Sequence, residues 1–171
     1  MRPEAAHSAP HRPESADTAQ PPRSELPGTT TPKPPTRELP NAALQELDGD
    51  PDDRASFLHA CARYDAGDHE STVAHLTALL RKRPLHLGAL KLLGYALYAR
   101  QAYALAASPL ITAAMLDSED PEPAYVAACC LIKTRDPELA RSLLQAVAEI
   151  SRRLPLHAEF GLRARQLLAT L

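Results

Sequence analysis

The sequence predicts an all-α protein in which helical hairpins stack side by side behind a proline-rich N-terminal arm. Three observations support this prediction. Ten of the 17 prolines in the 171-residue chain precede Asn41. The remaining residues are rich in Ala and Leu and contain few glycines and no Trp. From about Asp53 onward, apolar residues recur with helical spacing in three segments that resemble one another. We therefore expect an arm, residues 1–40, and one helical domain, residues 41–171.

The arm has only Leu26 and Leu39 as large apolar residues, so it cannot bury enough surface to offset the entropy lost on ordering. We expect it to be disordered. One phrase occurs twice in it, as Pro22–Pro27 and Pro35–Pro40, each ending in Glu-Leu-Pro. Such segments favour extended polyproline conformations and can serve as peptide ligands, although the repetition can also arise by chance.

Three units follow a short helix that Asn41 can cap, and each unit is a helix, a tight turn and a second helix. The expected segments span residues 56–68 and 71–83, 87–98 and 103–116, and 123–133 and 138–150. Aligning Cys61, Gly94 and Ala128 spaces the units by 33 and 34 residues, which is the period of tetratricopeptide repeats. The register of the first unit remains open by one residue.

Two further features concern the ends and interior of these helices. Pro109 lies within the second helix of the second unit, where we expect a kink or a late helix start. A last helix, from about Leu156 to Leu168, is expected to cover the open end of the stack with Phe160, Leu162, Leu167 and Leu168. The fold expected from the sequence is thus three repeats and a capping helix.

In this kind of repeat, the first helix of each pair lines the inner, concave wall. The residues expected there are Leu58, His59 and Ala62, then Lys91, Leu92, Tyr95 and Tyr98, then Tyr125, Val126, Cys129, Ile132 and Lys133. The wall is apolar, is edged by two lysines, and carries three of the five tyrosines. This pattern favours binding of an extended peptide, whereas the alternative is that the three tyrosines pack between helices.

Other functions lack the residues they require. The formal net charge of -2 gives no basic field for nucleic acid, and no apolar stretch is long enough for a membrane span. The N-terminal residues lack the apolar core of a secretory signal. The three cysteines suit neither a disulfide framework nor a metal site. The seven histidines show no ligand or triad spacing, and no glycine-rich phosphate loop is present. We expect no catalytic residue, no metal, no cofactor and no enzyme activity.

Two stretches carry a family resemblance. Glu122–Lys133, followed by Glu138-Leu-Ala140, resembles the third repeat of the class II chaperones of bacterial type III secretion, and Leu92–Leu97 is similar to their second. The resemblance extends over roughly residues 41–171. It implies a cytoplasmic bacterial protein that keeps the hydrophobic, pore-forming translocator proteins soluble before export, and homodimers formed through the N-terminal helices.

The resemblance also implies a mode of binding. A short extended cargo segment would place small apolar anchors, set between prolines, in the concave groove. The anchor pockets would be lined by Leu92, Tyr95, Tyr98, Tyr125, Val126 and Ile132, with Leu58 and Tyr64 at one edge. Because such cargo is bounded by prolines, Pro22–Pro27 or Pro35–Pro40 could occupy the protein's own groove until cargo arrives.

Two alternatives remain open. The first is a chaperone for a needle subunit, or an assembly factor, of the same secretion apparatus. The second is a general tetratricopeptide scaffold that binds acidic C-terminal tails through a clamp of Lys, Arg and Asn. Only Lys91 and Lys133 lie on the expected inner wall, so its apolar lining argues against such a clamp.

Overall fold

The computed structural model describes residues 50–171, which form seven α-helices and one short 3-10 helix. The α-helices are α2 (Pro51–Asp65), α3 (His69–Lys82), α4 (Leu87–Ala99), α5 (Tyr103–Leu116), α6 (Glu122–Lys133), α7 (Pro137–Arg153) and α8 (Ala158–Leu168), with η1 (Pro155–His157) before the last. No strand occurs in this part of the chain. The expected arm, the short helix after Asn41 and the boundary at residue 40 lie outside the described residues.

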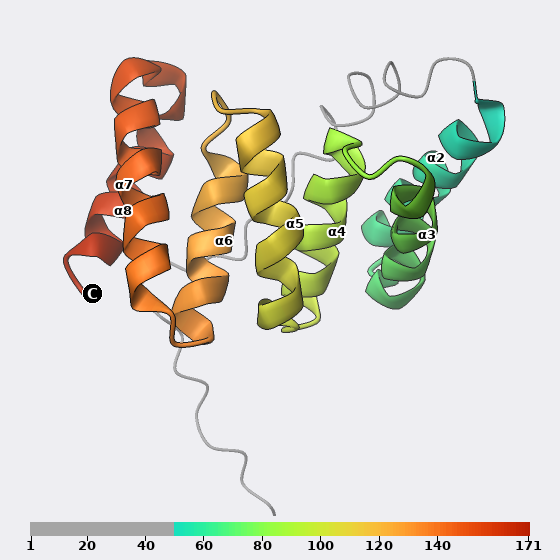
Figure 1. The fold of residues 1–171 in the computed structure, drawn as a ribbon, viewed down its shortest axis with the longest axis horizontal. Coiled ribbons are helices and arrows are strands. Elements are labelled where there is room, and N and C mark those ends of the chain that lie inside the picture. Colours follow the sequence, from blue (N-terminus) through green and yellow to red (C-terminus); the bar gives the residue numbers. More distant parts are fainter. Residues whose placement is uncertain (1–49) are drawn as a thin grey trace, which may run out of the picture.

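Successive helices pack against each other as antiparallel hairpins, α2 with α3, α4 with α5, and α6 with α7. Figure 1 shows the hairpins in sequence order, from α2 and α3 at one end to α7 and α8 at the other. The all-α, tetratricopeptide-like stack predicted from the sequence is therefore confirmed.

Acidic side chains begin three of the helices. Asp50 accepts hydrogen bonds from the backbone N–H groups of Asp52 and Asp53 at the start of α2. Asp68 caps α3 and Asp136 caps α7 in the same way. A carboxylate there satisfies free N–H groups and interacts favourably with the positive end of the helix dipole. The turns of the first and third hairpins therefore lead directly into α3 and α7, whereas α5, with Ala102 at its N-cap position, has no side-chain cap.

The turn inside each hairpin is the same structure repeated three times. One residue in each turn has a positive φ value: 78° at Gly67, 61° at Gln101 and 63° at Arg135. Each of these residues follows the previous one by 34 positions. In each turn the next residue's N–H bonds to a carbonyl five residues back, as Asp136 does to Leu131 at 2.9 Å. The repeat period thus appears in the backbone conformation as well as in the sequence.

Small residues let paired helices approach closely. A Cβ atom on Gly94 would lie 2.3 Å from Leu110 Cγ, so α4 and α5 meet at a point where only glycine fits. A Cβ on Gly161 would lie 2.7 Å from the Cβ of Ser151, which marks a similar approach of α8 to α7. Gly161 follows Ala128 by 33 residues, so α8 continues the repeat.

Two expectations about helix ends need correction. The late helix start at Pro109 is wrong, because α5 begins six residues earlier, at Tyr103, and continues through the proline. Pro109 has no N–H to donate to the carbonyl of Leu105, one helical turn earlier. Leu105 is 66% exposed, so water can bond to that carbonyl instead. The capping helix does pack on α7 and α6, but Leu156 and Leu162 are exposed and cover nothing.

Candidate functional site

The stack curves so that its even-numbered helices lie on the inner side. Among the described residues, α2 contacts α4, α4 contacts α6, and α6 contacts α8, whereas α3, α5 and α7 do not contact one another. Helices on the inside of a curved stack approach each other and those on the outside separate. We call the surface formed by α2, α4, α6 and α8 the concave wall.

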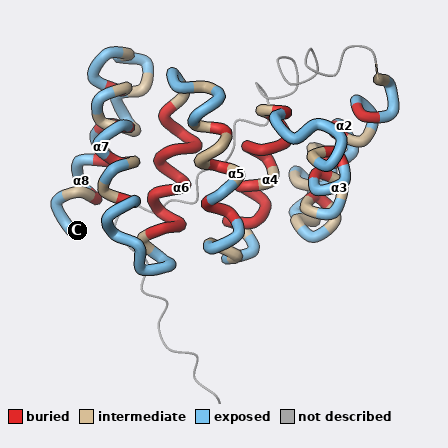
Figure 2. Tube along the Cα trace, in the orientation of Figure 1, coloured by how far each residue is buried: buried red, intermediate tan, exposed pale blue. Residues whose placement is uncertain are grey.

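Most of the predicted site residues on α4 and α6 lie close together in this wall and are buried. Figure 2 shows both helices buried along most of their length, in contrast to α3 and α7. The buried members are Lys91, Leu92, Tyr95, Tyr98, Tyr125, Val126 and Cys129. Ile132 is half-buried and Lys133 is exposed at the end of α6. Tyr95, Tyr98, Tyr125, Val126 and Cys129 belong to one continuous apolar cluster that extends from α4 to α8.

The residues predicted on α2 are arranged differently. His59 packs against His75 of α3, with ring centroids 4.5 Å apart, and accepts a hydrogen bond from Arg63. Leu58 and Ala62 are exposed. Tyr64, by contrast, is half-buried and packs against the cluster that contains Tyr95. The first helix therefore contributes to the wall mainly through Tyr64.

The tyrosines of the wall are neutral hydrogen-bonding groups. Burial raises the pKa of Tyr64 to about 12 and raises the pKa of Tyr95, Tyr98 and Tyr125 further. Two of them stack edge to face, Tyr98 on Tyr103 at 5.3 Å and Tyr125 on Phe160 at 5.8 Å. Tyr95, Tyr98 and Tyr125 thus pack between helices with their hydroxyl groups protonated, which is the alternative that the sequence left open.

A polar cluster lies where α4 meets the start of α6. Lys91 Nζ is 3.2 Å from Asp117 Oδ2 and 2.8 Å from Asp120 Oδ2. Burial tends to lower the pKa of Lys91, but the hydrogen bonds and charges of Asp120 and Asp117 outweigh it and raise that pKa. The lysine predicted to edge the groove is therefore neutralised by two carboxylates of the loop between α5 and α6.

Glu122 joins this cluster and was not predicted from the sequence. Its N–H donates to Asp120 Oδ1 at 2.9 Å, and its side chain is largely buried. Burial, followed by repulsion from Asp120, raises its pKa to about 7, although Lys91, the Tyr95 hydroxyl and Arg163 act in the opposite direction. The wall therefore contains an acid that changes charge near neutral pH.

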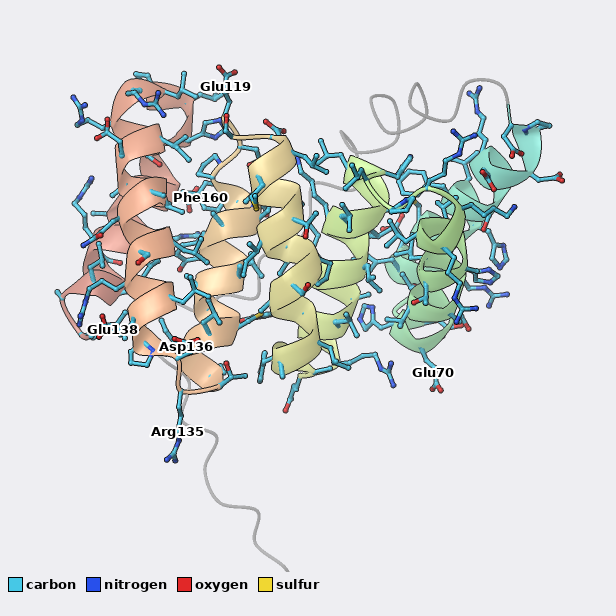
Figure 3. All side chains as sticks on the ribbon, viewed as in Figure 1. Glu70, Glu119, Arg135, Asp136, Glu138 and Phe160 are labelled. Atoms are coloured by element: carbon cyan, nitrogen blue, oxygen red, sulfur yellow. The ribbon has the colours of Figure 1, made fainter. Side chains whose placement is uncertain are left out.

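The contribution of α8 was also missed. Phe160, labelled in Figure 3, packs on Tyr125, and Arg163 is close enough to influence the pKa of Glu122, Tyr125 and Cys129. The sequence did contain a signal for this, because Gly161 continues the series of Cys61, Gly94 and Ala128. Extending the repeat by one more unit would have placed α8 in the wall rather than only at the end.

The three cysteine side chains pack among the helices and are not reactive groups. Cys129 and Cys130 are buried on α6, and all three thiols are free. Burial raises the pKa of Cys61 and Cys129 to about 11 and that of Cys130 to about 12, so the reactive thiolate form is scarce. Within residues 50–171 no group of three His, Cys, Asp or Glu side chains is placed to hold a metal ion. None of the helices described is long and apolar enough to span a membrane.

Comparison with known proteins identifies similar structures. No protein-family model matches the sequence, and no curated protein matches it significantly. The type III secretion translocator chaperone SycD of Yersinia enterocolitica superposes with a TM-score of 0.64 at 22% identity, over 74% of this chain and 89% of SycD. SycD in complex with a peptide of the translocator YopD gives 0.62 at 23% identity, over 68% and 88%.

A chaperone from another organism agrees with this result. PcrH, a protein of Pseudomonas aeruginosa, in complex with the chaperone binding region of PopD gives a TM-score of 0.62 at 20% identity, over 68% of this chain and 87% of PcrH. All three comparisons cover most of the solved chain. The described residues therefore have the tetratricopeptide-like fold seen in SycD and PcrH.

Proposed function

We propose that this protein is a cytoplasmic bacterial chaperone of type III secretion translocator proteins. It would bind an extended apolar segment of its cargo along the concave wall and keep the cargo soluble before export. The observation that carries the proposal is the inner side of the stack, where aromatic and aliphatic side chains of α4, α6 and α8, joined by Tyr64 of α2, belong to one continuous apolar cluster. An extended apolar peptide can bury its side chains on such a surface without leaving a charge unpaired.

The solved structures of similar fold support this proposal. SycD has been solved with a peptide of YopD, and PcrH with the chaperone binding regions of PopD and PopB. A dimer of SycD has also been described, which is consistent with a homodimer of this chain. By analogy, the cargo would be a translocator, and the concave wall would be the binding surface.

The alternative of a clamp for acidic tails is less favoured by the geometry. Lys91 is held between Asp117 and Asp120, so its charge is not available to a carboxylate ligand. Lys133 alone, exposed at the end of α6, cannot form a two-point clamp. The geometry does not argue against a chaperone for a needle subunit. Co-expression with a needle subunit and with a translocator distinguishes the two functions.

Co-expression tests the proposal. The full-length protein should make the hydrophobic translocator encoded beside it soluble and should co-purify with it, whereas a needle subunit should remain unbound. Combining Tyr95→Ala with Tyr125→Ala should reduce co-purification. Because both rings are buried, circular dichroism and thermal unfolding must show that the double variant is still folded under the conditions of the assay. Leu105→Ala on the exposed face of α5 is the control and should bind like wild type. A translocator that stays insoluble with wild-type protein refutes the chaperone function, and loss of helix content in the double variant assigns the tyrosines to the core.

A further inference from the structure

The concave wall is buried in its middle and exposed at its two ends. The residues that follow the aligned small positions occupy equivalent places on α2, α4, α6 and α8: Ala62, Tyr95, Cys129 and Leu162. Ala62 is exposed and Leu162 is 52% exposed, at the two ends of the stack. Tyr95 and Cys129, between them, are 2% and 4% exposed. Equivalent positions of one repeat thus differ sharply in their contact with solvent.

A second row of equivalent positions, one helical turn earlier, shows the same contrast. Leu58 of α2 and Ala158 of α8 are exposed, whereas Lys91 of α4 and Tyr125 of α6 are buried. Contacts between helices account for part of this burial, as where Phe160 of α8 packs on Tyr125. The next question is whether the neighbouring helices can account for all of it.

The helix α6 has no open side. Every residue from Glu122 to Leu131 is buried, as Figure 2 shows, and a segment of this length turns about three times around the helix axis. Among the described residues, α6 contacts only α4, α5, α7 and α8. Of these, α5 and α7 lie on its outer side, and α4 and α8 lie beside it in the wall. Four helices in these places leave the inner face of α6 uncovered, so its burial requires a further segment.

The N-terminal arm has the properties that such a segment needs. Residues 1–40 contain as many Lys and Arg as Asp and Glu, so the arm brings no net charge to a nearly neutral wall. Its two large apolar residues, Leu26 and Leu39, both stand in a Glu-Leu-Pro phrase. Extended segments that contain proline lose little conformational entropy when they bind an apolar groove.

The arm is also long enough to reach the wall. From α2 to α6 is two steps between neighbouring inner helices, or roughly 20 Å. An extended chain covers that distance in about seven residues. The arm precedes α2 directly in the sequence, so both phrases can reach α4 and α6.

We propose that the chain's own arm, through Pro22–Pro27 and Pro35–Pro40, covers the concave wall over α4 and α6 and keeps its middle closed until cargo displaces it. The inference rests on the proposed function, because it assigns regulation to the same wall. Cargo would first contact the exposed ends of the wall, at Leu58 and Leu162, and would then displace the arm between them.

The test uses the full-length protein and its own cysteines. Cys129 lies on the inner face of α6, and the adjacent Cys130, which is 0% exposed and turned about 100° away, is the internal reference. In the variant Leu26→Asp with Leu39→Asp, iodoacetamide should modify Cys129 at least about fivefold faster than in wild type, because access no longer requires release of the arm. Fragmentation mass spectrometry should show Cys130 unchanged.

The matched control is Ala5→Asp with Ala9→Asp, which adds the same two charges to the arm outside both phrases. It should label like wild type, and all three proteins should have the same melting temperature. A second measurement uses overlapping 15-residue peptides from the translocator encoded beside this protein, followed by fluorescence anisotropy. The peptide that binds wild type most tightly should bind the Leu26→Asp, Leu39→Asp variant about three- to tenfold more tightly, because the competing arm has been removed.

The labelling needs no cargo, so the inference and the proposed function can fail separately. If Cys129 is equally protected in wild type and in the leucine variant, the helices alone bury it and the inference is overturned. Protection in wild type that disappears on dilution would assign the cover to a second copy of the chain, and equal exposure in the alanine control would exclude the phrases; both results also overturn it. Faster labelling of Cys129 without binding of any translocator peptide would support the position of the arm and refute the proposed function.

Discussion

Glu122 gives the protein a pH-dependent stability that one substitution should remove. Its pKa is about 7 in the folded chain against an ordinary value of 4.5. Between these values the folded state holds more protons than the unfolded state, so the free energy of unfolding falls as the pH rises. The contribution is fully present below about pH 4.5 and is lost as the pH passes 7. A shift of about 2.5 pKa units corresponds to about 3 kcal/mol across this window.

The neighbours of Glu122 define what the substitution changes. Asp120 adds to the rise in its pKa, whereas Lys91, Tyr95 and Arg163 reduce it. Glu122→Gln removes the ionisable group and retains the shape of the side chain. The variant should therefore lose the decline that wild type shows as the pH rises through 7, and should gain about 2.5 kcal/mol over wild type between pH 5 and pH 8.

Urea unfolding followed by circular dichroism at pH 5, 6, 7 and 8 measures this difference, since titration of all other groups cancels when variant and wild type are subtracted. Glu119→Gln is a matched control, because Glu119 lies in the loop just before α6 but is exposed, as Figure 3 shows. As an exposed substitution, Glu119→Gln should change the free energy of unfolding by no more than about 0.5 kcal/mol. A Glu122→Gln difference that is constant within about 0.5 kcal/mol across the series would refute the reasoning.

Four other predictions follow from the packing and from the arm. Gly94→Ala should destabilise the protein by about 1–3 kcal/mol because the new methyl group meets the side chain of Leu110, and adding Leu110→Ala should relieve that clash, both measured by thermal unfolding. Arg135→Gly should raise stability by up to about 1 kcal/mol, since residue 135 has φ 63° and Figure 3 shows its side chain directed away from the helices. Lys91→Met should lower stability by about 1–3 kcal/mol at neutral pH, because it leaves two paired carboxylates without their cation. Deleting residues 1–40 should increase affinity for a translocator peptide if the repeated proline phrases compete for the wall, and unchanged affinity in anisotropy titrations would remove that hypothesis.

Much of the fold could be predicted because it is encoded locally. The positions of Gly94 and Ala128 define the period, and the aspartates that begin α3 and α7 act within a few residues of where they stand. The late helix start at Pro109 was wrong because the effect of a proline on α5 depends on whether water can reach the carbonyl it leaves unpaired, which is a property of the assembled surface.

The site was predictable only in its apolar part. Helical periodicity brings Tyr95 and Tyr125 to the same side of their hairpins, and the structure buries both in the concave wall. The state of Lys91 could not be predicted in this way, because its partners are 26 and 29 residues further along the chain and meet it only when α5 has folded back. Glu122 was missed for the same reason, since its burial depends on helices from other hairpins.

The side chains of the concave wall are almost all uncharged, and this limits what the wall can bind. Burial keeps its tyrosine and cysteine side chains protonated, and the ammonium group of Lys91 is balanced by two carboxylates. An uncompensated charge facing the groove would raise the free energy of any apolar segment laid over it, because burying an unpaired ion is far more costly than burying a hydroxyl. A neutral wall therefore favours hydrophobic cargo and disfavours acidic tails. Glu122 is the exception, because its pKa is about 7. If an apolar cargo segment lies along this wall as proposed, its affinity should therefore depend on pH near neutrality.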